Sequence, residues 1–137
     1  LFPYTTLFRS WAADGLDLTE KDSYIDSREK VHFNRLSAAE RKALIEKNPA
    51  YGRVICRCET VTEGEILDAI HSPIPPVSVD GIKRRTGAGM GRCQGGFCGP
   101  RVVDLLAREL GVSPLTILQD RDGSEILTAY TKGEVRA

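Results

Sequence analysis

The chain has 137 residues, 41% hydrophobic and 28% charged, so its length and composition fit one small globular domain with flanking segments. Lysine plus arginine equals aspartate plus glutamate, at 19 each. Net charge therefore gives no reason to expect nucleic acid or an anionic membrane as a partner. No apolar run approaches the roughly 20 residues of a membrane span. We expect no nucleic-acid partner and no direct membrane span.

The first ten residues, LFPYTTLFRS, resemble the conceptual translation of a common sequencing adapter. We interpret residues 1–10 as a non-native, adapter-derived segment and leave them out of the fold prediction. The alternative interpretation is an aromatic-rich strand of a preceding domain. Because the sequence has no initiator methionine, we expect it to be the end of a longer protein.

Residues 11–35 are charged and irregular, which predicts a linker or an extension that packs on another domain. Ser37 and Glu40 then have the spacing of a capping box. They predict a helix over residues 38–47, which ends before Pro49 because the residue before a proline disfavours helical geometry.

Thr62 and Glu65 form a second potential capping box. Apolar residues at helical spacing predict a helix over residues 63–71. The prolines within residues 72–76 end this helix, because proline cannot continue it.

Asp80 is expected to cap a short helix that ends near Thr86. Pro100 and Gly111 have the positions that favour the start and the end of a further helix. The chain from Ser113 is expected to form a last short helix. The apolar stripe of the helix between Pro100 and Gly111 consists of Val102, Val103, Leu105, Leu106 and Leu110.

The four cysteines form two close pairs, Cys56-x-Cys58 and Cys93-x4-Cys98, separated by 34 residues. Two pairs on two loops can present four thiolates to one inorganic centre. The second loop, residues 89–99, holds five glycines in eleven residues. Glycine allows positive φ and close approach, so backbone N–H groups can point at the sulfurs and help to set a reduction potential.

The spacing alone leaves several kinds of site open. An iron–sulfur cluster is favoured, and a structural zinc site is the main rival, although C-x-C is a tight hook for zinc. Two disulfides would need an oxidising compartment, and a redox-active C-x-C dithiol would not explain the second pair. His32 and His71 lie beside neither pair, so we expect surface or packing roles for them.

From Lys83 to Arg101 the chain has basic residues and no acidic one. These cations could offset the negative charge of a thiolate-bound cluster. Lys83–Arg85 could equally be a solvated helix face, whereas Arg92, next to Cys93, is a better candidate for tuning. Phe97, inside the second pair, could shield the cluster from water or pack against Leu105 or Leu106.

Two stretches carry a family resemblance, VICRCE at 54–59 and GMGRCQGGFC at 89–98. Together they make residues 54–119 similar to the bacterioferritin-associated-ferredoxin-like (BFD-like) [2Fe–2S] domain. The run at 80–101, DGIKRRTGAGMGRCQGGFCGPR, most resembles the domain that ends the flavoprotein subunit of anaerobic glycerol-3-phosphate dehydrogenases and related FAD-dependent oxidoreductases.

The resemblance implies that Cys56, Cys58, Cys93 and Cys98 ligate a [2Fe–2S] cluster. It implies a mainly α fold: a small helical domain with ligand loops at helix ends, preceded by an irregular and helical linker. The expected organisation is a linker and helix at 11–50, from the end of an FAD-dependent dehydrogenase module that is absent here, then the BFD-like domain at 51–119 and a polar tail at 120–137.

The implied function is one-electron transfer from FAD in that absent module, through the cluster, to an electron-accepting partner subunit or quinone. The catalytic site would then lie outside this chain, with glycerol 3-phosphate as the expected substrate. One alternative is a docking or structural module stapled by a cluster or by zinc; another is a free-standing ferredoxin. The expected location is the cytoplasm, with possible attachment to the inner membrane face through a partner.

Overall fold

The computed structural model describes residues 13–15 and 30–131. The chain divides into two units, Leu1–Lys30 and Val31–Ala137, and the elements below belong to the second. The adapter-like residues 1–10 and most of the expected linker lie outside the described residues. In the part of the chain that is described, no helix combines the length and the apolar character needed to cross a bilayer.

The fold is mainly α, as the sequence predicts, with one small two-stranded sheet. Strands β1 and β2 are antiparallel, and Val54 lies opposite Thr62. In chain order the elements are the 3-10 helix η1 (Phe33–Arg35), α2 (Ala38–Lys47), η2 (Pro49–Gly52), β1 (Val54–Cys56), β2 (Val61–Thr62), α3 (Glu63–Ile70), α4 (Val79–Thr86), α5 (Gly99–Leu110) and η3 (Pro114–Thr116).

Both predicted capping boxes are confirmed. The Ser37 side chain accepts from the Glu40 N–H, while the Glu40 carboxylate accepts from the Ser37 N–H at 2.7 Å. Thr62 and Glu65 make the same reciprocal pair at the start of α3. Each box satisfies N–H groups that would otherwise lack a partner at the helix start.

The prediction that Asp80 caps α4 is wrong. Ser78 is the N-cap, because its hydroxyl accepts from the Gly81 N–H at 3.1 Å. Asp80 lies inside the first turn, where its carboxylate accepts from Arg84 and from Gln119. Asp80 therefore joins α4 to the segment that follows η3.

Helix α5 ends as predicted, with Gly111 in the left-handed region at φ 66°. Its apolar stripe is buried, apart from the half-buried Leu110, and packs with α3, α4 and the residue after η3. Ile66, Ile82 and Leu106 have no exposed side-chain surface, and Ile117 is 1% exposed. These four residues come from four different segments, so the core joins all of them.

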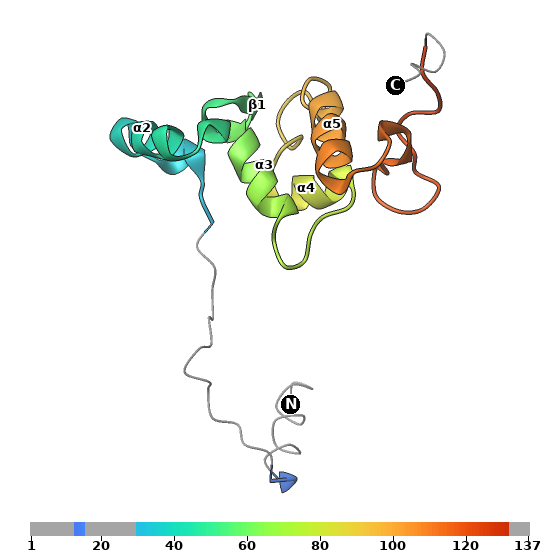
Figure 1. The fold of residues 1–137 in the computed structure, drawn as a ribbon, viewed down its shortest axis with the longest axis horizontal. Coiled ribbons are helices and arrows are strands. Elements are labelled where there is room, and N and C mark those ends of the chain that lie inside the picture. Colours follow the sequence, from blue (N-terminus) through green and yellow to red (C-terminus); the bar gives the residue numbers. More distant parts are fainter. Residues whose placement is uncertain (1–12, 16–29, 132–137) are drawn as a thin grey trace. The chain divides into compact units, whose positions relative to one another are not determined.

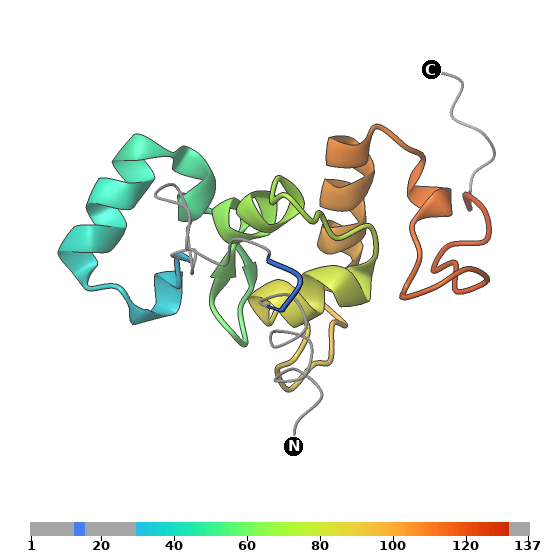
Figure 2. The ribbon, with the colours of Figure 1, turned by 90° about the horizontal axis from the view of Figure 1, so that it is seen from below.

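The β1–β2 hairpin and the 87–98 loop lie at the same end of α3 and α5, the upper end in Figure 1. In the view from below, α4 crosses beneath this arrangement (Figure 2). The helices thus form a base that carries two loops at one end.

The polar segment that follows η3 keeps local structure at its start, because the Gln119 N–H donates to the Ser124 carbonyl at 2.8 Å.

Candidate metal centre

The first cysteine pair lies on the β1–β2 hairpin. Cys56 is the last residue of β1, pairs with Val61 across the sheet and is buried in the core. Cys58 follows in the turn, where its side chain is exposed. One pair therefore places one thiol inward and the other toward the surface.

The second pair lies on the glycine-rich loop. Cys93 is half-buried, whereas Cys98 is 2% exposed and immediately precedes α5. Tight turns shape the loop, since the Gln94 N–H donates to Gly91 at 3.0 Å and the Gly96 N–H donates to Cys93 at 2.9 Å. The second pair repeats the pattern of the first, with one thiol buried and one nearer the surface.

The two loops touch at Gly91. A Cβ added there would lie 2.1 Å from the Cys58 Cβ and 3.2 Å from the Cys58 Sγ. No side chain fits in that space, so glycine is required by contact between the loops. The sequence indicates a glycine-rich loop, but it does not single out Gly91 or show that the close approach is to Cys58.

One thiol contact joins the two loops. The Cys58 and Cys93 sulfurs are 3.7 Å apart. Burial raises the pKa of the Cys98 thiol to about 11, and the neighbouring thiols of Cys56 and Cys93 add to this rise. Among the described residues, no three His, Cys, Asp or Glu side chains are grouped so that they could hold a single metal ion.

Backbone N–H groups surround the Cys93 sulfur. The N–H of Phe97 is the largest influence and lowers the pKa of the Cys93 thiol, with smaller contributions from Cys58 and from the N–H groups of Gly95 and Gly96. Such donors favour the thiolate, which is the form that binds metal. The loop backbone thus favours the charged form of the Cys93 thiol.

A buried carboxylate fixes the strand that leads into the first pair. Glu63 has a side chain only 5% exposed, and it pairs with Arg53 at 2.7 Å and with Arg108 at 3.0 Å. The Glu63 N–H also donates to the Arg53 carbonyl at 2.8 Å. Because Arg53 precedes β1 and Arg108 lies on α5, Glu63 ties the hairpin to α3 and α5. Sequence reasoning missed this role.

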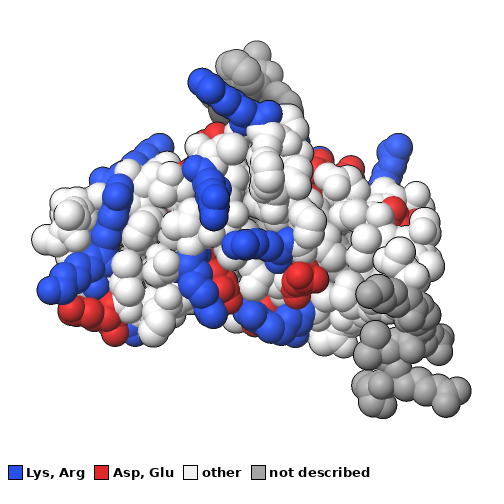
Figure 3. Space-filling model, turned by 90° about the horizontal axis from the view of Figure 1, so that it is seen from above, with Lys and Arg blue, Asp and Glu red and all other residues white. Residues whose placement is uncertain are grey.

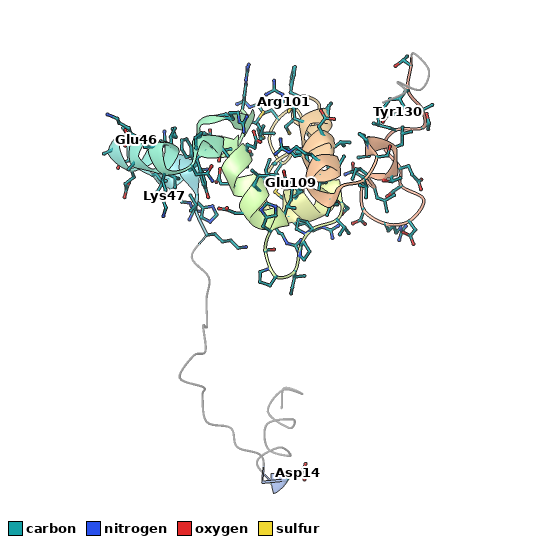
Figure 4. The ribbon with its side chains drawn as sticks, in the orientation of Figure 1. Asp14, Glu46, Lys47, Arg101, Glu109 and Tyr130 are labelled. Carbon is teal, nitrogen blue, oxygen red and sulfur yellow. The ribbon has the colours of Figure 1, made fainter. Side chains whose placement is uncertain are left out.

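The four arginines of 83–101 separate into two groups. Arg84 pairs with Asp80 and Asp120, and Arg85 donates to the carbonyls of Gly81 and Ile74. These two arginines support local structure. Arg92 and Arg101 are exposed and have no ion pair among the described residues. Figure 4 labels Arg101 at the loop end of α5 and Glu109 nearer its other end.

Two further expectations concern single side chains. His32 and His71 are exposed as expected, and His71 contacts Glu109 at 2.9 Å rather than a cysteine. Phe97 does not pack against Leu105 or Leu106, because its side chain is 84% exposed. Packing on α5 was therefore the wrong expectation for Phe97.

The region of the cysteines is shared with known proteins. Residues 54–108 match the family model of the BFD-like [2Fe–2S] binding domain. The chain is 49% identical over 120 residues to a glycerol 3-phosphate dehydrogenase of Caloramator mitchellensis, an alignment that covers 87% of this chain and 25% of that protein. No solved structure matches the chain.

Two more relatives share this region. Hydrogen cyanide synthase subunit HcnB of Pseudomonas aeruginosa is 38% identical over 95 residues, which are 61% of this chain and 20% of that protein. An anaerobic glycerol-3-phosphate dehydrogenase subunit of Escherichia coli K12 is 36% identical over 66 residues, 48% of this chain and 12% of that protein. This chain thus spans at most about a quarter of each relative. Its segment 54–108 belongs to the BFD-like [2Fe–2S] binding domains.

Proposed function

We propose that Cys56, Cys58, Cys93 and Cys98 hold a [2Fe–2S] cluster and that this chain carries single electrons for an FAD-dependent dehydrogenase of the glycerol-3-phosphate type. The observation that carries the proposal is the close approach of the two cysteine loops, where the Cys58 and Cys93 sulfurs lie 3.7 Å apart. The family of segment 54–108 supports the choice of cluster.

The donor set fits such a centre. Two sulfurs on one tetrahedral metal, with metal–sulfur bonds of about 2.3 Å, lie about 3.8 Å apart. The Cys58 and Cys93 sulfurs are separated by 3.7 Å. Four thiolates are the usual ligands of a [2Fe–2S] cluster. The four thiols on the two touching loops match this ligand set in number and type.

The bound cluster would supply reversible one-electron redox chemistry. The chain's own residues supply the setting for it. Cys56 and Cys98 anchor the site in the core, and N–H groups of the second loop stabilise negative charge on Cys93. For each two-electron oxidation of substrate in the parent protein, the module would carry two electrons in succession.

The setting of this module is part of the proposal. The longer relatives, of which the alignments cover 25% and 12%, include proteins named as glycerol 3-phosphate dehydrogenases. An FAD-bearing module in cis would oxidise glycerol 3-phosphate, and a partner subunit or quinone would accept the electrons. The substrate and FAD sites would lie in the part of the parent protein that this chain does not span.

A second function is favoured by a different observation. Cys56 and Cys98 belong to the hydrophobic core as well as to the cysteine cluster. A metal centre bound to them would staple a small core, and small domains often gain needed stability in this way. In this case the chain would be a docking or structural module without redox turnover.

The deciding experiment is Cys93→Ser in the full chain purified without oxygen. We expect the variant to lose most of its iron and its visible absorption, while Ser113→Ala, away from the loops, keeps both. Reversible one-electron bleaching of the unmodified protein without unfolding supports electron transfer. A centre that cannot be reduced, or whose reduction unfolds the chain, supports the structural role instead.

A further inference from the structure

The loop end of the molecule exposes large side chains that a folded protein normally covers. Phe97 is 84% exposed and Met90 is 52% exposed, and both belong to the second ligand loop. Neither contributes to the core, which α5 and its neighbours already fill. Exposed aromatic and methionine side chains beside a functional site are the residue types enriched at protein interfaces.

Three arginines lie in or beside the two ligand loops, which approach each other at Gly91 and Cys58. Arg57 lies between the first two cysteines, Arg92 precedes Cys93 and Arg101 lies in the first turn of α5. All three are exposed, and none has an ion pair in the described part of the chain. Arginines elsewhere, such as Arg53 and Arg108, are held by carboxylates. The loop arginines are therefore free to pair with another molecule.

These exposed apolar and arginine side chains are also close in sequence to the cysteines. Cys58 is exposed, and its sulfur is 3.7 Å from that of Cys93. Figure 3 looks onto this end of the molecule and shows Lys and Arg side chains gathered over the middle of the face, with some acidic ones among them. Glu59, next to Cys58, is half-buried against the position of Gly91. A partner that covered this face would approach the exposed thiol pair.

We infer that the loop face, defined as Arg57, Met90, Arg92, Phe97 and Arg101, docks a redox protein whose surface has carboxylates around an apolar recess. This inference rests on the proposed function. Phe97 would enter the recess, and the three arginines would pair with the carboxylates and steer the encounter. Because the whole chain has a formal net charge of zero, attraction of an acidic protein depends on local charge at this face.

The test uses two protein oxidants of opposite charge, an acidic plastocyanin and the basic cytochrome c. The full chain with its cluster is reduced, and the rate of electron transfer to each oxidant is followed by stopped flow. Ionic strength is raised from about 0.01 M to about 0.15 M, which shortens the screening length from roughly 30 Å to roughly 8 Å. We expect the plastocyanin rate to fall roughly tenfold and the cytochrome c rate to stay level or rise.

Variants of the loop face show which side chains produce the salt dependence of the electron-transfer rate. Replacing the three arginines together by glutamine should remove most of the salt dependence with plastocyanin, and lysine at the same positions should retain it. Phe97→Ala should lower the rate several-fold at every ionic strength, since apolar burial is little affected by screening. The matched controls, Arg121→Gln and Ile74→Ala, change an exposed arginine and a 76% exposed isoleucine outside the loops.

The absorption spectrum and reduction potential of each variant separate the two proposals. If the cluster forms and is reduced reversibly, but plastocyanin shows no salt-sensitive preference, or Phe97→Ala and Ile74→Ala behave alike, the docking inference is wrong and the proposed function stands. If the unmodified chain binds no reducible cluster, both are wrong. If the triple variant loses its cluster, each single arginine-to-glutamine variant is compared with its lysine counterpart. If none of these pairs differs in the salt dependence of the plastocyanin rate, the docking inference is wrong.

Discussion

The helical base and the loop end of this domain use apolar side chains in opposite ways. In the base, Ile66, Ile82 and Leu106 are completely buried, whereas on the second ligand loop Phe97 is 84% exposed. Arginines differ in the same way, since Arg108 on the base is paired, whereas Arg92 on the loop has no ion pair within residues 13–15 and 30–131. Within the described residues, the base buries its apolar side chains in one core, whereas the loop end brings the cysteines together and leaves Phe97 exposed.

The contact between the two ligand loops at the loop end should be the most sensitive point. Gly91→Ala would place a Cβ within 2.1 Å of the Cys58 Cβ, so the loops must separate. We expect cluster occupancy to fall at least tenfold, measured as iron and acid-labile sulfide per chain. Gly99→Ala is the matched control, because a Cβ there meets nothing within 4 Å. Equal occupancy in the two variants would show that the loops do not need this contact.

A change in the base should affect stability rather than the loop face. Leu106→Ala leaves a cavity at a side chain with no exposed surface, and such changes cost about 2–5 kcal/mol of unfolding free energy. Chemical denaturation of the cluster-free chain measures this loss. Phe97→Ala is the comparison, with an expected change within about 0.5 kcal/mol because its side chain is exposed. A similar cost for both would contradict the distinction between base and loop end.

Glu63→Gln tests the link from the base to the first cysteine pair. The variant keeps the shape of the buried side chain but loses the charge that Arg53 and Arg108 share. Since both arginines are more than half exposed, part of the loss is screened, and we expect about 1–3 kcal/mol. The control is Glu46→Gln, which removes an exposed pair with Lys42 and should cost less than about 0.5 kcal/mol. If the two variants lost the same stability, the ion pairs of Glu63 would not be what holds the hairpin to α3 and α5.

The smallest expected effect concerns the start of α4. Ser78→Ala removes the hydroxyl that accepts from the Gly81 N–H, and loss of an N-cap costs about 1 kcal/mol. Thermal unfolding compared with Ser72→Ala, a serine outside the helices, measures the change. If Ser72→Ala destabilised the chain more, the cap would not be the main support of this helix start.

Local signals in the sequence predict much of the base. The capping boxes at Ser37 and Thr62 and the glycine that ends α5 at Gly111 are encoded within a few residues, so their prediction needs no knowledge of packing. Ser78 was harder to identify because Asp80, two residues later, is also a favourable cap. In the folded chain the Asp80 carboxylate accepts from Gln119 instead, a contact between segments that are distant in the sequence.

The cysteine spacing predicts a candidate centre, but it does not say which thiols meet. The spacing groups the cysteines by loop, whereas the fold brings the sulfurs of Cys58 and Cys93, from different loops, to 3.7 Å. The exposure of Phe97 is likewise not encoded locally, because an aromatic residue near α5 is equally compatible with packing. Both features depend on how two loops from distant parts of the chain come together.

The central claim is that the four thiols hold a reducible [2Fe–2S] cluster. The most direct measurement is the iron and acid-labile sulfide content of the full chain purified without oxygen, together with its visible spectrum before and after one-electron reduction. The account predicts two irons and two sulfides per chain, the stoichiometry of one [2Fe–2S] cluster, and a brown colour that bleaches and returns. A colourless chain with one zinc and no sulfide would contradict it.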